Sequence, residues 1–171
     1  MSRNRIDATR PDSPPLAGPG PMPIGVQTFT LTDPARRVLP EAGTKPPYRL
    51  KTAPRSLTVE LWYPAAPDAG DEEPPRDQYE TILRDGVTRA LLTGRARREA
   101  ARAKGRWPLV LISHGYPGNR HLLSHLAEAL ASRGYLVAAA DHPGSTYDDQ
   151  EAFGATLYHR PLDQRFLLSE L

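Results

Sequence analysis

The segment SHGYPGNR, residues 113–120, places a histidine, two glycines and a tyrosine where an apolar run ends. The preceding run, LVLI at 109–112, is typical of a parallel strand that is covered on both faces. Glycine in such a loop lets the backbone approach a ligand closely, because it has no Cβ. Backbone N–H groups held about 3 Å from a developing oxyanion stabilise it during acyl transfer. The pattern therefore indicates chemistry in which negative charge forms on an oxygen atom.

A second polar loop, DHPGSTYDD at 141–149, also follows an apolar run. Ligands of open α/β sheets bind where the strands end, so we expect the two loops to meet at one edge. His142, Ser145 and Asp148 could be drawn as a hydrolytic triad, but three such residues in one polar loop are commonplace. We assign them no catalytic role, and we expect Asp141 to organise the loop.

The remaining candidates give weaker signals. His114 is expected to pack and form hydrogen bonds that shape its loop rather than to transfer protons. Ser124 and His125 are neighbours on a predicted helix and should point in different directions. His121 and His159 are expected at the surface near helix ends. No spacing of His, Asp and Glu suggests a metal site, the chain has no cysteine, and we predict no cofactor.

The elements that must position these loops form a strand–helix–strand unit. Residues 109–112 and 135–140 are predicted strands, and residues 119–134 between them form a predicted helix with Asn119 as its N-cap and Gly134 at its end. Such a unit gives parallel strands with a right-handed crossover. The apolar stripe expected on the helix consists of Leu122, Leu123, Leu126, Ala127 and Leu130. A further helix is predicted in RPLDQRFLLSEL, with Pro161 in its first turn.

Two strands are predicted before this unit. IGVQTFTLTD at 24–33 should end at the turn signal Asp33–Pro34. SLTVELWYP at 56–64 alternates polar and apolar residues, which predicts a half-buried antiparallel strand. The face expected to be buried carries Leu57, Val59, Leu61 and Tyr63.

The region 64–106 is expected to be a variable insertion. Its acidic, proline-rich start, 64–77, should be a linker or surface loop. QYETILRDGVTRALL then spaces apolar residues as in a helix, and a basic helix is predicted over 95–106. This basic helix could form an anion-binding or membrane-surface patch, or it could be a solvated helix end whose cations the helix dipole favours.

Composition sets the frame for these elements. The chain has 171 residues, 19 of them proline and 13 glycine, which indicates long irregular segments. We predict a flexible leader at 1–23 and one domain at 24–171. A formal net charge of +2 gives no reason to expect a nucleic-acid partner. The sequence shows no signal peptide and no transmembrane segment, so a cytoplasmic location is expected.

The motifs WYP, SHG and DHPG, followed by RPLD, occur in an order that resembles the α/β-hydrolase superfamily. More narrowly, they resemble dienelactone-hydrolase-like and platelet-activating-factor-acetylhydrolase-like esterases. The resemblance covers residues 24–171, without a recognised motif in 65–106. It implies an incomplete α/β-hydrolase fold, in which N-terminal antiparallel strands precede a βαβ unit of a mostly parallel sheet with flanking helices.

The resemblance also implies roles for three residues of the first loop. The backbone N–H of Tyr116 would be one oxyanion-hole donor, and Gly115 would permit close approach of the substrate. Tyr116 and Pro117 would contact the substrate, a small-molecule carboxylic ester. The assignment requires that the Tyr116 N–H is not already bonded to neighbouring main chain.

The family's nucleophile lies in a Gly-x-Ser-x-Gly turn, and the sequence contains no such motif. We therefore expect the chain to be the N-terminal part of a longer esterase and to be inactive alone. In the resembled fold the strand at 109–112 would lack one neighbour, so self-association through its unpaired edge is expected. Two other functions stay open: a non-catalytic α/β module that binds a ligand or partner, and an interaction protein that uses the leader and the basic helix.

Overall fold

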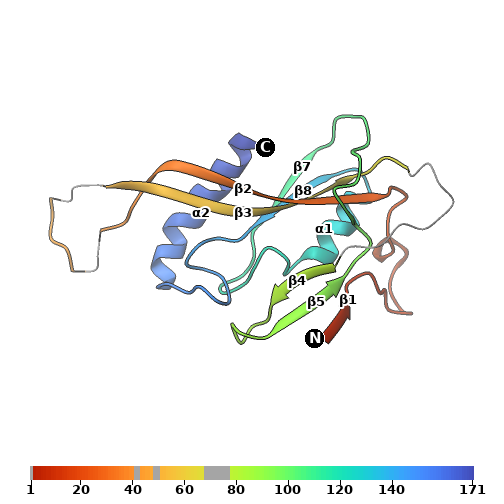
Figure 1. Cartoon of the computed structure of the whole chain (residues 1–171), viewed down its shortest axis with the longest axis horizontal. Coiled ribbons are helices and arrows are strands. Elements are labelled where there is room, and N and C mark those ends of the chain that lie inside the picture. Colours follow the sequence, from red (N-terminus) through yellow and green to blue (C-terminus); the bar gives the residue numbers. More distant parts are fainter. Residues whose placement is uncertain (1, 41–42, 48–50, 68–77) are drawn as a thin grey trace.

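The computed structural model describes residues 2–40, 43–47, 51–67 and 78–171, which form two sheets and two α-helices (Figure 1). The elements before the first loop are β1 (Ser2–Arg5), the 3-10 helix η1 (Pro15–Ala17), β2 (Ile24–Arg37), β3 (Thr52–Pro64), β4 (Gln78–Ile82), β5 (Arg89–Thr93), β6 (Arg97–Arg98) and β7 (Leu109–Ile112). After it come α1 (Ser124–Ala131), β8 (Leu136–Ala140) and α2 (Phe153–Glu170).

The larger sheet has five strands in the order β6-β2-β3-β8-β7. β7 and β8 are parallel and flank α1, as the strand–helix–strand prediction requires. β3 runs antiparallel to both β2 and β8, and β6 pairs in parallel with β2. The sheet is therefore mixed, where a mostly parallel one was expected. In the described part of the chain, β8 is the one strand that pairs with β7, so β7 forms an edge of the sheet.

β3 lies in the centre of this sheet and is buried on both faces toward its end. Leu57, Val59, Leu61 and Tyr63 share one face with Leu167 of α2, and Trp62 packs on the opposite face with residues of α1. The predicted alternation is confirmed, but the strand is not half-buried, because helices cover the sheet from both sides. Buried Glu60 lies on the same face as Trp62, since both positions are even.

The helix predictions for residues 78–92 and 95–106 are wrong. β4 and β5 form an antiparallel hairpin that pairs with β1 in a second, three-stranded sheet, and Arg97–Arg98 form the short strand β6. The turn is held by Asp85, which accepts hydrogen bonds from the backbone N–H groups of Val87 and Thr88 at 3.1 and 2.8 Å. Gly86 there has a φ of +75°, which glycine adopts readily. This Asp-Gly turn outweighs the helical spacing of the apolar residues.

The helices predicted between the two parallel strands and near the end of the sequence are present as α1 and α2, but their ends and buried residues differ from the prediction. The buried face of α1 consists of Ser124, Ala127, Glu128 and Ala131, while Leu122 and Leu126 are exposed. Asn119 does not cap α1, because its side chain contacts Thr81, Ile82 and the backbone of His121. Gly134 has the expected positive φ, +92°. Pro161 lies inside α2 rather than in its first turn.

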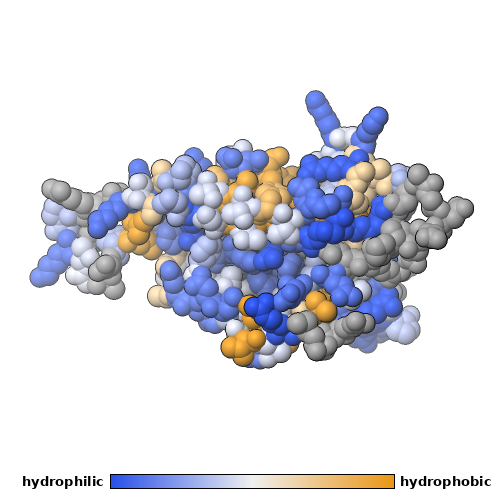
Figure 2. Space-filling view, in the orientation of Figure 1, coloured by the Kyte–Doolittle hydropathy of each residue, from blue (hydrophilic) through white to orange (hydrophobic). Residues whose placement is uncertain are grey.

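The N-terminal segment makes specific contacts although a flexible leader was expected. β1 pairs with β5, and Gly20 and Met22 donate backbone hydrogen bonds to Ser132 at 2.7 and 3.0 Å. No helix among the described residues is long and apolar enough to cross a membrane. Figure 2 shows hydrophobic side chains gathered over the middle of the long β2–β3 ribbon, within a face that is otherwise largely polar.

Candidate active site

The loops that follow β7 and β8 meet at one edge of the sheet, as predicted. Gly118 donates a backbone hydrogen bond to the carbonyl oxygen of Ser145 at 3.2 Å, and Tyr147 donates one to that of Gly118 at 3.0 Å. Asp141 accepts a hydrogen bond from the backbone N–H of Arg120 at 2.7 Å and pairs with its guanidinium. Asp141 thus organises the loops, because it ties the end of the first to the start of the second.

A buried carboxylate anchors the same end of the first loop. Glu60 is fully buried on β3 and accepts hydrogen bonds from Thr28 and Arg98 at 2.8 and 2.7 Å, and from Arg120 at 3.3 Å. Burial by itself would raise the pKa of Glu60, but His121, Arg98 and Thr28 lower it to about 2. Glu60 therefore stays ionised and holds Arg120 in place.

His114 shapes the first loop from inside the protein. Its side chain is 3% exposed, and its Nε2 accepts a hydrogen bond from the backbone N–H of His142 at 3.3 Å. The proton must then lie on Nδ1, which donates to the carbonyl oxygen of Gly115 at 2.7 Å. Burial lowers the pKa of His114 to about 4, so the ring is neutral near pH 7. A Cβ at Gly118 would lie 2.8 Å from His114 Nδ1, which explains why glycine is required there.

The peptide between Gly115 and Tyr116 has a defined direction. Its carbonyl oxygen accepts from buried His114 Nδ1 and, at 3.4 Å, from Nη1 of Arg160. In a trans peptide the N–H points opposite to the C=O. The Tyr116 N–H is therefore directed away from the His114 ring, and among the described residues it has no hydrogen-bond partner.

The other predicted residues of this loop are exposed or half-buried. An ideal Cβ on exposed Gly115 would meet no atom nearer than the Pro117 carbonyl oxygen at 3.8 Å, so internal packing does not require glycine there. The Tyr116 hydroxyl donates to the carbonyl oxygen of Glu151, and its ring packs edge-on against Phe153 with centroids 5.1 Å apart. The next residue, Pro117, is half-buried. The start of α2 thus fixes the Tyr116 side chain.

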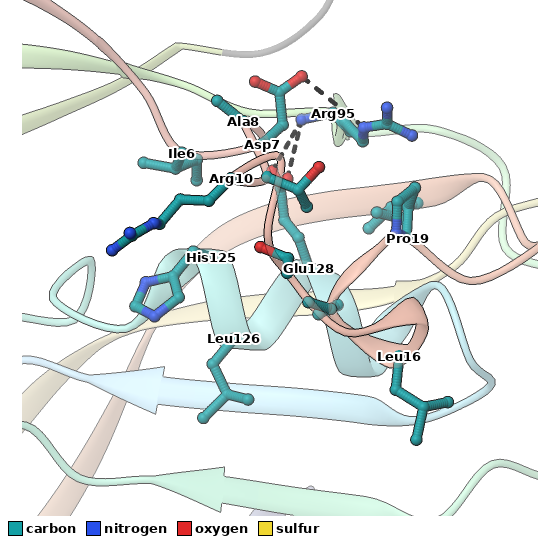
Figure 3. Close-up of a pocket in the computed structure, with 15 residues that line it drawn as sticks. Ile6, Asp7, Ala8, Arg10, Leu16, Pro19, Arg95, His125, Leu126 and Glu128 are labelled. Carbon is teal, nitrogen blue, oxygen red and sulfur yellow. Dashed lines mark hydrogen bonds and ion pairs between the residues drawn. The ribbon is translucent and has the colours of Figure 1, made fainter.

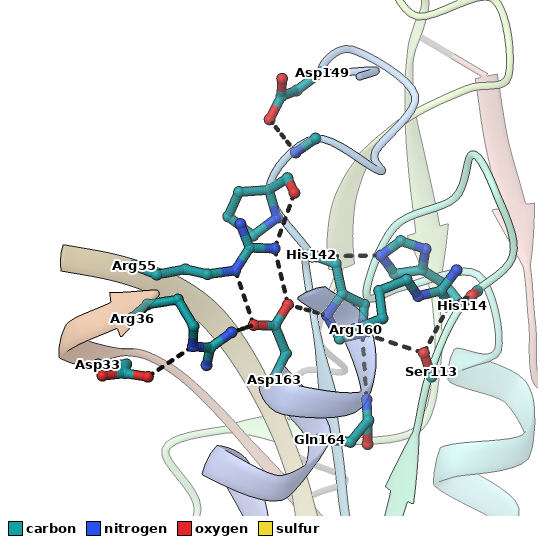
Figure 4. A network of polar contacts seen from close by, with 12 residues as sticks. Asp33, Arg36, Arg55, Ser113, His114, His142, Asp149, Arg160, Asp163 and Gln164 are labelled. Atoms are coloured by element: carbon teal, nitrogen blue, oxygen red, sulfur yellow. Dashed lines mark hydrogen bonds and ion pairs between the residues drawn. The ribbon is translucent and has the colours of Figure 1, made fainter. Parts of the chain in front are cut away.

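A serine, a histidine and an aspartate form a hydrogen-bonded line behind this loop (Figure 4). The Ser113 hydroxyl lies 3.2 Å from Nε2 of His142, whose Nδ1 lies 2.9 Å from a carboxylate oxygen of Asp163. Ser113 is exposed, whereas His142 and Asp163 are fully buried. By type and distance the three residues resemble a Ser–His–Asp triad.

The charges around Asp163 argue against a triad. Asp163 also receives hydrogen bonds from Arg36 at 2.5 Å and from Arg55 at 2.8 and 2.9 Å. Burial by itself would raise the pKa of Asp163, but hydrogen bonds from His142 and Arg55 hold it well below its usual range. Two guanidinium groups compensate the carboxylate, which leaves little negative charge to stabilise an imidazolium. The line therefore acts as a structural brace between β7, β8 and α2.

The other combination considered from the sequence is not assembled. His142 bonds to Ser113 and Asp163, while Asp148 accepts a hydrogen bond from Thr146 at 2.9 Å. The Ser145 hydroxyl is buried without a hydrogen-bond partner in the described chain.

The remaining serine and histidine candidates differ in how deeply they are buried. Buried Ser124 and exposed His125 do point in different directions. His121 was expected at the surface but is buried beside Glu60, and His159 is half-buried. No group of three His, Asp or Glu side chains among the described residues could hold a metal.

Sequence reasoning missed the residues that support the loop. Arg160 on α2 donates to the Ser113 hydroxyl at 2.6 Å and to the carbonyl oxygens of His114 and Gly115. Arg36 and Arg55 come from strands more than a hundred residues away from Asp163 in sequence. A signal did exist in RPLD, where Arg160 and Asp163 are three residues apart and so share one face of a helix.

A cavity of about 400 Å³ lies elsewhere, between the N-terminal segment and α1 (Figure 3). Glu128 in its wall already accepts from the Tyr79 hydroxyl at 2.6 Å and from the backbone N–H groups of Arg95 and Ala96. Asp7 pairs with Arg5 and Arg95. Both carboxylates are therefore engaged by other residues of the described chain.

Comparison with known proteins agrees with an α/β-hydrolase-like fold. Residues 76–160 match the sequence model of the family described as platelet-activating factor acetylhydrolase, isoform II. Among solved structures, the chain is similar to a ferulic acid esterase from Streptomyces cinnamoneus, with 26% sequence identity and a TM-score of 0.64. That match covers 98% of this chain and 49% of the esterase, so the chain spans about half of the esterase's length. The search of curated proteins found no match.

The sheet order and the match to the esterase structure together support an α/β-hydrolase-like fold for this chain. The chain is similar to the acetylhydrolase family over residues 76–160 and to the ferulic acid esterase over 98% of its length, and both likenesses support an esterase-like family.

Proposed function

We propose that residues 1–171 carry the oxyanion-hole loop of a carboxylic ester hydrolase, in which the backbone N–H of Tyr116 is one of the donors. The nucleophile would lie outside these residues, because the chain has no Gly-x-Ser-x-Gly motif and spans about half of the ferulic acid esterase. The substrate would be a small-molecule ester, of the acetyl or ferulic acid kind that the names of the matched family and of the similar esterase suggest.

The observation that carries this proposal is the orientation of the Gly115–Tyr116 peptide. Its carbonyl oxygen is held on the His114 side, so the N–H projects to the other side, where no described residue accepts it. An unpaired donor on a braced loop at a strand end suits an oxyanion that forms only during the reaction. A Cβ at exposed Gly115 would meet nothing closer than the Pro117 carbonyl oxygen at 3.8 Å, so an ester carbonyl could approach the backbone there.

The reaction would follow the scheme of serine ester hydrolases. A serine hydroxyl attacks the ester carbonyl carbon and loses its proton to a histidine, and the carbonyl oxygen becomes an oxyanion. Tyr116 N–H would stabilise this oxygen together with the N–H of the residue after the nucleophile. Collapse of the intermediate expels the alcohol, and water then releases the acid from the acyl-enzyme.

Removal of the single N–H group tests the proposal. The α-hydroxy acid analogue of tyrosine at position 116 replaces the backbone N–H by an ester oxygen and keeps the side chain. In the intact enzyme that contains residues 1–171, we expect kcat for p-nitrophenyl acetate to fall by about 10²- to 10³-fold. Tyr116→Phe is the matched control, because it keeps the N–H and loses only the hydroxyl contact with Glu151. An unchanged kcat in the ester variant, or an equal loss in the control, would overturn the proposal.

The brace gives a second arm to this test. Ser113 would be the nucleophile if the line to His142 and Asp163 were a working triad. We therefore expect a fluorophosphonate probe to leave Ser113 of the 171-residue chain unlabelled by mass spectrometry. Labelling of Ser113 that is lost in His142→Gln would place the nucleophile inside the chain and refute this part of the proposal.

A further inference from the structure

Arg160 has an unusual environment for a half-buried arginine. It lies on α2 at the edge of the first loop, and its hydrogen-bond acceptors in the described chain are all neutral: the Ser113 hydroxyl and the carbonyl oxygens of His114 and Gly115. Nearby Asp163 is already occupied by Arg36, Arg55 and His142. The guanidinium of Arg160 thus serves three consecutive residues of one loop rather than an ion pair (Figure 4).

The planar fork of arginine suits this task. Its N–H groups diverge in a fixed geometry, so one side chain can hold several acceptors at once, which the single ammonium of lysine cannot do. The carbonyl oxygens of His114 and Gly115 are the two acceptors that set the directions of the peptides on either side of Gly115. Glycine has more backbone freedom than any other residue, so these peptides need external support.

His114 supports the same peptide from the interior. Its Nδ1 donates to the Gly115 carbonyl oxygen at 2.7 Å, and its Nε2 is fixed by the backbone N–H of His142 at 3.3 Å. Arg160 reaches that carbonyl oxygen from α2 at 3.4 Å. Two donors from different elements therefore converge on one oxygen atom, and the N–H of Tyr116 on the other side of the peptide is aimed by their joint hold.

We infer that Arg160 and His114 are positioning residues that fix the direction of the Tyr116 N–H by binding the Gly115 carbonyl oxygen. Neither side chain needs to contact the substrate. The inference rests on the proposed function for its catalytic consequence, but its structural content, a rigid peptide at 115–116, stands apart from any activity.

The test measures the Tyr116 amide directly in the ¹⁵N-labelled intact enzyme that contains residues 1–171. Wild-type Tyr116 should have a backbone order parameter near 0.85, and Arg160→Gln should lower it to below about 0.6. Arg160→Lys, a milder change that keeps the charge, should give an intermediate value. Arg165→Gln changes an exposed arginine of the same helix and should leave Tyr116 unaltered. The same spectra show whether each variant is folded.

A second variant separates the two positioning residues. His114→Phe keeps an aromatic ring but removes the Nδ1 donor, and it should also lower the Tyr116 order parameter. An order parameter that stays near the wild-type value in both Arg160→Gln and His114→Phe would overturn the inference.

Kinetics of the intact enzyme distinguish this inference from the proposed function. With the N–H misaimed, Arg160→Gln should reduce kcat by about 10- to 100-fold while KM changes little. A lowered order parameter with unchanged kcat would leave the positioning role standing and refute Tyr116 as an oxyanion donor.

Discussion

Acidification from about pH 7 to about pH 5 should reduce the free energy of unfolding of the chain through His114. Its ring is buried, and both nitrogens are used: Nδ1 donates to Gly115 and Nε2 accepts from the His142 backbone. A second proton would have to go to Nε2, where it would face the His142 N–H. The folded chain therefore resists protonation of this histidine, and the unfolded chain does not.

The size of the loss follows from the two pKa values. Burial lowers the pKa of His114 from 6.5 to about 4 in the folded chain. Between these values the unfolded state binds more protons, so stability is present above pH 6.5 and falls as the pH drops toward 4. For each state, proton binding by His114 contributes a factor of 1 + 10^(pKa − pH). At about pH 5 this factor is about 30 times larger for the unfolded chain than for the folded chain, which lowers the free energy of unfolding by about 2 kcal/mol. At about pH 7 the loss is only about 0.2 kcal/mol.

Other groups titrate in ways that the measurement can separate. The pKa of Glu60 falls from 4.5 to about 2, so its contribution to stability is lost only below pH 4.5. Burial also lowers the pKa of His159, which adds a loss of the same sign in the same interval. A variant of His114 isolates its share, because every other group is present in both proteins.

The assay is urea unfolding of the chain and of His114→Gln at both pH values. Glutamine cannot take up the proton, so the variant should be less stable at about pH 7 but should lose about 2 kcal/mol less than wild type on acidification. His125→Gln, a change at an exposed histidine of α1, should keep the wild-type loss. Equal acid losses in wild type and His114→Gln would refute the neutral, doubly bonded ring.

Two further predictions concern packing and association. Gly118→Ala places a methyl group 2.8 to 3.0 Å from His114 atoms, so it should destabilise the chain by about 1–3 kcal/mol in urea titrations. Gly154→Ala on α2 adds a methyl group that meets no atom within 4 Å, so it should stabilise the chain by about 0.5–1 kcal/mol. A destabilisation by Gly154→Ala as large as that by Gly118→Ala would contradict this packing. The exposed edge of β7 should let the chain pair with a second copy, so sedimentation equilibrium should show association that grows with concentration; a monomer at all concentrations would exclude that edge as an interface.

Local sequence predicted the part of the fold that depends on neighbouring residues. The runs at 109–112 and 135–140, with a helix between them and Gly134 after it, determined the strand–helix–strand unit. The hairpin of β4 and β5 was not predicted, because its apolar residues also fit a helical period. The dipeptide Asp85–Gly86 is nevertheless a hairpin turn signal. Spacing over a dozen residues cannot separate the two structures when a short turn motif decides between them.

In the candidate site, too, some features depend on neighbouring residues and others on residues that are distant in sequence. The glycines, His114 and Tyr116 in SHGYPG indicated oxyanion chemistry, since the loop itself supplies the peptide that would carry the donor. Its direction depends on Arg160, and the brace behind it depends on Asp163 with Arg36, whose hydrogen bond spans 127 positions. Spacing along the chain says nothing about which distant side chains converge.

The sequence by itself therefore determined which loop holds the candidate donor, because strand ends, glycines and local periodicity are properties of adjacent residues. Only the tertiary structure decided where that donor points. The direction of one peptide is set by hydrogen bonds from a buried histidine and from an arginine on the last helix, and these meet only after the sheet has brought β7, β8 and α2 together.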